Sequence, residues 1–246
     1  MSWPPTAPTS GADLPQFRPD TDGTHPPLLT PEYTSTRLRA PLKPPVDLPQ
    51  RLTEVSGPVL GDGLVQPEDA DLTRGYAEQP AGQRIVVSGR LLEGDGRPVP
   101  HSLVEIWQAN AAGRYRHDRD NWPAPLDPNF DGMGRTLTDD DGRYSFTTIK
   151  PGAYPWKNHH NAWRPAHIHF SLFGRSFTQR LVTQMYFPDD PLFAQDPIFN
   201  SAPAQARDRM IAKFSLQDTQ PDWALAFTFD IVLRGSDATP FEEGSA

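Results

Sequence analysis

The sequence predicts an all-β fold: a β-sandwich of about seven to eight strands, with a long proline-rich N-terminal arm and one short helix. From Arg84 onward, short runs of β-branched and aromatic residues alternate with turns of Gly, Pro and Asp, which is typical of antiparallel hairpins. Regular helices do not separate these runs, so a parallel α/β fold is not expected. Prolines gather instead in the first part of the chain.

Residues 1–80 are predicted to form the extended arm, and residues 81–246 a single sandwich domain. Proline accounts for 29 of the 246 residues, and 12 of those 29 lie in the first 50 positions. Such a segment cannot form a helix or a central strand, so it is either disordered or laid over a surface. Because it also carries Trp3, Phe17 and Tyr33, more apolar content than a linker needs, we favour an arm that wraps a partner.

The expected strands follow one another along the rest of the chain. The first is RIVVSGRLL, before the turn EGDGRPVP, and the second lies within HSLVEIWQAN. Further strands are expected at residues 134–137, 143–149, 166–173, 179–187 and 224–234. In the last of these, alternate apolar residues from Leu225 to Leu233 share one face, which is the two-residue period of a strand.

One helix is expected in the segment SAPAQARDRMIAKFSL, residues 201–216. Ser201 is a residue type that caps helix N-termini, and Pro203 suits the first helical turn. Met210, Ile211 and Phe214 then recur at helical spacing. The segment is therefore predicted to be a short crossover helix between strands.

Composition excludes several classes of function. The net charge is −8 and the 23 Lys and Arg residues form no basic patch, so a nucleic-acid partner is not expected. No apolar run reaches about 18 residues, and the start MSWPPTAPTS lacks the features of a signal peptide, so a cytoplasmic protein without membrane spans is expected. The chain has no cysteine, so any metal ligands must be His, Tyr, Asp or Glu.

Two pairs of side chains suggest chemistry. In WRPAHIHF, strand alternation places His167 and His169 on one face and Ile168 on the other, which gives either a polar surface patch or half of a metal site. Tyr115 lies in NAAGRYRHDRD and Tyr154 in KPGAYPW. Each tyrosine alone is explained by an ordinary hydrogen bond, but two phenolates, two imidazoles and a hydroxide would neutralise and hold ferric iron.

Six longer stretches resemble a known family. They are LVEIWQANAAGRYRH, APLDPNFDGMGRTLTDDDGRYSF, IKPGAYPWKN, WRPAHIHF, LVTQMYF and FDIVLRG. Together they resemble the β subunits of the protocatechuate 3,4-dioxygenases, which are intradiol ring-cleaving enzymes, over about Leu28 to Gly235. Catechol and hydroxyquinol dioxygenases share the iron motif, but their chains typically begin with a helical dimerisation segment instead of a proline-rich arm.

The resemblance implies a non-haem Fe(III) ion bound by Tyr115, Tyr154, His167 and His169. It implies intradiol cleavage of protocatechuate (3,4-dihydroxybenzoate) by O2 to 3-carboxy-cis,cis-muconate, a reaction of aromatic compound catabolism in the β-ketoadipate pathway. Residues 81–246 would then be the catalytic domain.

Further roles follow from the same resemblance. Tyr154 is implied to be catalytic, because substrate displaces it from the metal and it then accepts a substrate proton. Arg164 would stabilise negative charge on the ring, and Gln184 would lie near the oxygen site. The implied substrate-binding residues are Tyr33, Trp107, Trp156, Arg164 and Tyr186.

The resemblance also implies partners. A homologous α subunit would complete the pocket for the catecholic substrate and O2, and the two subunits would assemble into a higher hetero-oligomer. Three alternatives are left open by the residues themselves. The first is cleavage of catechol or hydroxyquinol. The second is a ferrous oxygenase in which Asp139 or Glu105 joins the two histidines, and the third is a non-catalytic β-sandwich binding module.

Overall fold

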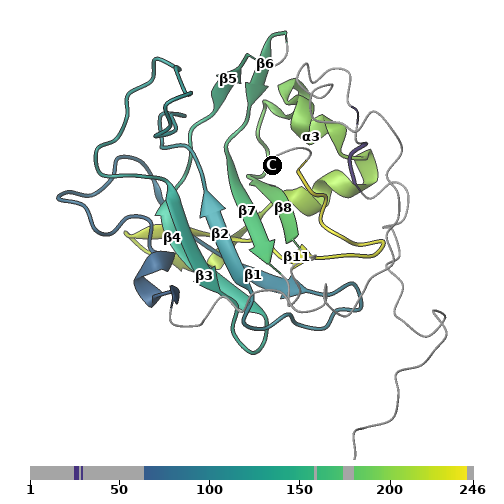
Figure 1. The fold of residues 1–246 in the computed structure, drawn as a ribbon. Coiled ribbons are helices and arrows are strands. Elements are labelled where there is room, and N and C mark those ends of the chain that lie inside the picture. The colour runs from purple at the N-terminus through teal and green to yellow at the C-terminus, as the bar shows by residue number, and fades with distance from the viewer. Residues whose placement is uncertain (1–24, 28, 30–63, 158–159, 174–179, 243–246) are drawn as a thin grey trace, which may run out of the picture.

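Two β-sheets packed face to face form the body of the protein (Figure 1), as the computed structural model shows for residues 25–27, 29, 64–157, 160–173 and 180–242. This arrangement confirms the predicted all-β sandwich. Most of the expected arm, including Tyr33, lies outside the described residues, so the wrapping of a partner stays a prediction. In the described part, no helix is long and apolar enough to cross a membrane.

The first sheet has five strands and is built around β1. Its strands are β1 (Arg84–Leu92), β4 (Arg143–Ile149), β9 (Lys213–Gln220), β10 (Ala224–Thr228) and β11 (Ile231–Val232). β1 pairs antiparallel with β4 and parallel with both β10 and β11. β9 pairs antiparallel with β10 and extends the sheet further from β1.

The second sheet has four antiparallel strands and carries the histidines. In spatial order these strands are β3 (Met133–Leu137), β2 (Leu103–Trp107), β7 (His167–Phe173) and β8 (Arg180–Tyr186). A small antiparallel pair, β5 (Tyr154–Trp156) and β6 (Ala162–Arg164), stands above the start of β7 in Figure 1. The start of β7 and the small pair therefore lie at the same end of the sandwich.

The core lies between the two sheets, and it fixes the direction of the histidines. Ile168 and Phe170 of β7 are completely buried in a cluster that also holds Phe146 of the first sheet. The rings of Phe170 and Phe146 are 5.8 Å apart. Because strand residues alternate between faces, His167 and His169 project away from this core, as the sequence predicts.

Most expected strands form where the pattern places them, but the run at residues 224–234 is interrupted. It divides into β10 and β11 because the Asp230 carboxylate accepts a hydrogen bond from the Arg90 backbone N–H at 2.9 Å, in place of a backbone carbonyl. Phe227, Phe229 and Ile231 are still buried in the core, so the predicted face is confirmed. With β5, β6 and β9 added, the described residues form eleven strands.

The prediction of a helix over residues 201–216 is wrong. The α-helix, α3 (Pro197–Ser201), ends where that prediction begins, and its N-cap is Asp196. A 3-10 helix, η4 (Ala204–Met210), follows Pro203, whose extended backbone separates the two. The chain then enters β9, where Phe214 pairs with Phe227 of β10, so tertiary pairing overrides the local helical pattern. Two further 3-10 helices are η2 (Pro67–Ala70) and η3 (Phe193–Gln195).

Candidate metal centre

The two histidines of β7 lie side by side, and each has its Nε2 atom available for a ligand. Both imidazoles are buried, and their ring centroids are 4.9 Å apart. His167 Nδ1 lies 2.7 Å from the Pro165 carbonyl oxygen, to which it donates, and His169 Nδ1 lies 2.8 Å from Glu242 Oε2. Because each Nδ1 is engaged in this way, each Nε2 is left with a lone pair for a metal.

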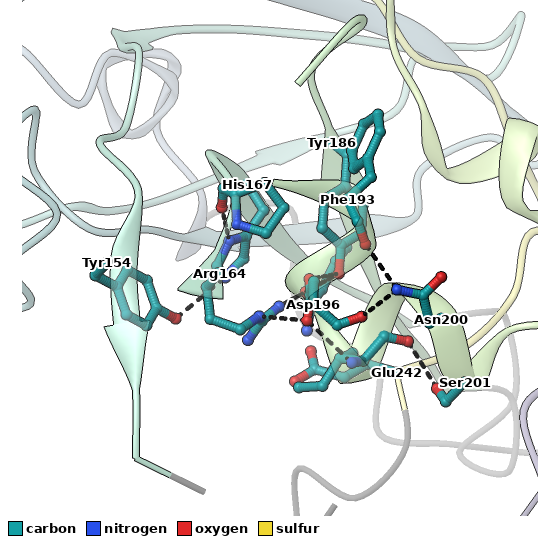
Figure 2. Close-up of polar contacts among 12 residues, drawn as sticks. Tyr154, Arg164, His167, Tyr186, Phe193, Asp196, Asn200, Ser201 and Glu242 are labelled. Carbon is teal, nitrogen blue, oxygen red and sulfur yellow. Dashed lines mark hydrogen bonds and ion pairs between the residues drawn. The ribbon is translucent and has the colours of Figure 1, made fainter. Parts of the chain in front are cut away.

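Two tyrosine hydroxyls meet those nitrogens. Tyr154 of β5 places its Oη 3.3 Å from His167 Nε2 (Figure 2). Tyr115, on the loop after β2, places its Oη 3.2 Å from His169 Nε2. The two phenol rings pack edge to face with centroids 5.6 Å apart. Four potential ligand atoms from three separate segments therefore converge on one small region.

Two glycines allow the tyrosine-bearing segments to approach so closely. Gly113, with φ of +77°, lies against the Ala153 carbonyl oxygen, where a β-carbon would collide with backbone. Gly152 lies in the same way against the Ala111 carbonyl, and its N–H donates to Asn110 O at 2.9 Å. The backbone two residues before each tyrosine is therefore held against the other segment.

We expect Gly113→Ala to disrupt the centre. The added β-carbon would push residues 152–154 away from the loop, so Tyr115 and Tyr154 would separate and iron binding would weaken. Gly96→Ala is the matched control, since Gly96 has a similar φ of +82° but nothing within 4 Å of its β position. Iron content per chain measures the difference, and equal retention of iron by both variants would contradict this reading of the loop.

Burial shifts the pKa values of Tyr115, Tyr154 and His167. It raises the pKa of Tyr115 well above the ordinary value, and the nearby Tyr154 raises it further. Burial also raises the pKa of Tyr154, although the charge of Arg164 opposes the rise. The pKa of His167 is held well below its ordinary value by burial, then by Arg164 and His169. The imidazole is thus neutral, as a ligand must be, and only a strongly charged cation would ionise the phenols.

Arg164 supplies a buried positive charge beside the centre. It pairs opposite Tyr154 in the β5–β6 ladder, and Figure 2 shows its side chain between Tyr154 and Asp196. Its Nε lies 3.0 Å from Asp196 Oδ1, and its Nη2 donates to Gln184 Oε1 and, at 3.3 Å, to the Tyr186 hydroxyl. Burial alone lowers the pKa of Arg164, but Asp196 and the neighbouring phenols raise it above normal, so the guanidinium stays charged.

The other expected site residues lie around this centre. Trp107 stacks on His169, with centroids 4.8 Å apart and planes 7° from parallel. The ring of Trp156 lies 5.7 Å from the Arg164 guanidinium carbon. Tyr186 is completely buried, and its hydroxyl contacts Asp196 at 3.0 Å as well as Gln184. The substrate contacts expected of these side chains stay predictions, and Tyr33 lies outside the described residues.

Sequence reasoning missed two carboxylates of the site, Asp196 and Glu242. Asp196 precedes Pro197 in QDPIF, a pattern that indicates a helix cap, and it does cap α3 by accepting from the Ile198 N–H at 2.9 Å. No sequence pattern near Asp196 indicates that it pairs with Arg164. Glu242 lies in the acidic tail FEEGSA, which has the composition of a solvated terminus. Only the fold brings Asp196 to Arg164 and Glu242 to His169.

The arrangement does not support a histidine and carboxylate triad. Among the residues that the structure describes, no group of three or more His, Asp or Glu side chains could hold a metal. Asp139 instead accepts hydrogen bonds from the backbone of Asp141 and Arg143 in a turn. Glu242 meets His169 at Nδ1, which is the ring nitrogen turned away from Tyr115. The donor atoms that do lie together are the phenol oxygens and imidazole nitrogens described above.

Comparison with known proteins identifies the family of this chain. A family model described as "Dioxygenase" matches residues 55–235, and one described as "Protocatechuate 3,4-dioxygenase beta subunit N terminal" matches residues 17–51. The chain is 58% identical over 220 residues to the protocatechuate 3,4-dioxygenase beta chain of Burkholderia cepacia. That match covers 89% of this chain and 94% of the Burkholderia protein.

Two more distant relatives extend the comparison. The protocatechuate 3,4-dioxygenase alpha chain of Pseudomonas putida is 32% identical over 204 residues, which are 79% of this chain and 96% of that one. Among solved structures, 3-chlorocatechol 1,2-dioxygenase of Rhodococcus opacus 1CP superposes with a TM-score of 0.53 at 23% identity. The match covers 70% of this chain and 66% of the Rhodococcus chain, and it supports the fold alone.

Proposed function

This chain belongs to the intradiol dioxygenase family, in its protocatechuate 3,4-dioxygenase β branch, and from that premise we propose that it cleaves protocatechuate between its two hydroxyl groups with O2. The product is 3-carboxy-cis,cis-muconate, an intermediate of aromatic compound catabolism in the β-ketoadipate pathway. The observation that carries the proposal is the convergence of two phenol oxygens and two imidazole nitrogens at one end of the four-stranded sheet.

The cofactor that fits these donors is a non-haem Fe(III) ion. Tyr115, Tyr154, His167 and His169 would hold it, because two phenolates and two neutral imidazoles balance most of its charge. When bound, the ion acts as a Lewis acid that holds the catecholate and activates its ring carbon toward O2. The two anionic phenolate oxygens support the ferric over the ferrous state.

Tyr154 is the side chain that we assign to proton transfer. Arg164 lies opposite Tyr154 in the β5–β6 ladder, and its charge is the main influence that lowers the pKa of Tyr154 against the effect of burial. With substrate bound in the site, the Tyr154 Oη would accept the proton of a substrate hydroxyl and so act as a general base. The phenol then stays beside Arg164 without an unpaired charge.

Arg164 is assigned to stabilise the negative charge that develops on the substrate ring, and Gln184 is assigned to the oxygen site beside it. Arg164 is fixed by Asp196 and Gln184 before substrate arrives, so its charge needs no rearrangement during the reaction. The Trp107 ring on His169 and the Trp156 ring beside Arg164 are assigned to the walls of the ring-binding pocket. Both walls are flat and apolar, as an aromatic substrate requires.

A homologous α subunit is the proposed partner. Alpha chains of the same enzyme are among the relatives of this chain, which supports an α/β pairing and a higher hetero-oligomer. The α subunit would complete the pocket around the substrate carboxylate, and Tyr33 of the arm is proposed to approach the ring. Location in the cytoplasm also stays a prediction.

Co-expression of the chain with a candidate α subunit tests the function. We expect purified complex to hold one iron per β chain, to be red-brown, and to consume protocatechuate and O2 in equal amounts. The product, identified by mass spectrometry and NMR, should be 3-carboxy-cis,cis-muconate. Faster turnover of catechol or hydroxyquinol would instead identify the alternative substrates, and ring opening outside the two hydroxyls would contradict the reaction class.

A further inference from the structure

The C-terminal segment, residues 238–242, contacts the candidate centre at the Nδ1 side of His169. Its last described residue, Glu242, places Oε2 2.8 Å from His169 Nδ1, and both side chains are about nine-tenths buried. Figure 2 shows Glu242 on the side of the cluster away from Tyr154. We propose that Glu242 is a positioning residue that fixes the His169 imidazole and strengthens its bond to the ferric ion, an inference that rests on the proposed iron centre.

The position of Glu242 is built into both sheets. The Glu242 N–H donates to the Val182 carbonyl of β8 at 2.6 Å, and the buried Thr183 hydroxyl donates to the Pro240 carbonyl at 2.6 Å. On the first sheet, Thr239 exchanges two hydrogen bonds with Val232 of β11, at 2.9 and 3.1 Å. These four hydrogen bonds fix the backbone that carries Glu242 relative to both sheets.

The expected arm adds one more anchor to the same segment. His25 stacks on Phe241 with ring centroids 4.2 Å apart, and its Nδ1 accepts the Phe241 N–H at 3.3 Å. Phe241 directly precedes Glu242, so a residue of the arm holds the backbone that carries the carboxylate. The arm is thereby connected to the centre through two residues, although most of it lies outside the described part of the chain.

The Nδ1 atoms of the two histidines have different hydrogen-bond partners. His167 donates to the neutral carbonyl of Pro165, whereas His169 faces a carboxylate. A carboxylate on the Nδ1 side holds the tautomer whose Nε2 lone pair points at the metal, and it makes that nitrogen a stronger donor. A fixed negative charge close to the ion also favours the higher oxidation state. Glu242 should therefore increase both iron retention and the preference for Fe(III).

Glu242→Gln in the co-expressed complex tests the inference, because it keeps the shape and removes the charge. We expect iron to dissociate into a chelator about 10- to 100-fold faster, the Fe(III)/Fe(II) reduction potential to rise, and the tyrosinate-to-iron absorption band to shift. Glu242→Asp, which keeps the charge, should raise the reduction potential less than Glu242→Gln does. Glu93→Gln is the matched control, since Glu93 is a partly exposed carboxylate that pairs with Arg234 at 3.1 Å and with none of the candidate ligands, and it should leave all three values unchanged.

The outcomes separate this inference from the proposed function. If the wild-type complex holds iron with its coloured band and Glu242→Gln has the same iron release, potential and band, Glu242 has no such role. If the wild type itself binds no iron, the proposed centre fails instead. Should Glu242→Gln not fold, Phe241→Ala, which leaves the carboxylate but removes the His25 stack, decides. A raised potential in that variant supports the inference, and an unchanged one overturns it.

Discussion

Tyr115→Phe is expected to weaken the visible absorption band of the iron-loaded protein strongly and to lower kcat for protocatechuate by more than about 100-fold. Loss of a group that only orients a ligand costs about 10- to 100-fold, so loss of an anionic ligand should cost more. The change removes one oxygen 3.2 Å from His169 Nε2 and leaves the ring packed against Tyr154. Stopped-flow oxygen uptake and visible absorption spectra measure the two effects.

Tyr144→Phe is the control for this substitution. The Tyr144 hydroxyl is also buried, but it donates to the Phe229 carbonyl within the sandwich core. We expect this variant to lose about 1–3 kcal/mol of stability, because a buried acceptor is left without its partner, and to keep iron, colour and kcat. If Tyr115→Phe behaved like Tyr144→Phe, Tyr115 would not be a metal ligand.

Arg164→Met is expected to impair both stability and activity. The Arg164 and Asp196 side chains are 3% and 0% exposed and lie 3.0 Å apart, and removal of one partner from a buried ion pair costs about 3–5 kcal/mol. The loss of preorganised positive charge should also lower kcat by about 100- to 1000-fold. Denaturant unfolding of the metal-free protein and steady-state kinetics measure the two losses separately.

A double variant distinguishes the two roles of Arg164. In Arg164→Met/Asp196→Asn, the unpaired carboxylate is gone while the asparagine can still accept from the Ile198 N–H that Asp196 caps. We expect much of the unfolding free energy to return and kcat to stay low. Recovery of kcat together with stability would mean that Arg164 acts only as a structural partner of Asp196.

Much of the fold could be predicted from the sequence because strand signals are local. Alternation in the histidine strand and in the run from Leu225 to Leu233 gave the correct faces, since the large apolar residues that recur at every second position pack into the core. The pattern at residues 201–216 misled, because Met210, Ile211 and Phe214 have helical spacing but belong to a 3-10 helix, a bridge and a strand. Pairing with β10 is a long-range effect that local spacing does not report.

The candidate ligands were also predictable, but their surroundings were not. Tyr115, Tyr154 and the two histidines lie in stretches that a family resemblance identifies residue by residue, and the structure brings their donor atoms together. Asp196, the N-cap of α3, contacts Arg164, which lies more than 30 residues earlier in the chain. Glu242, in the C-terminal segment, contacts His169, which lies 73 residues earlier. Nothing in a run such as FEE signals a contact at that distance.

An iron-edge anomalous diffraction map of crystals of the iron-loaded complex tests the central claim most directly. We expect one iron peak per β chain, within bonding distance of the Oη atoms of Tyr115 and Tyr154 and the Nε2 atoms of His167 and His169. A peak held by carboxylates elsewhere, or one that meets the histidines without either phenol, would contradict the shared four-ligand centre.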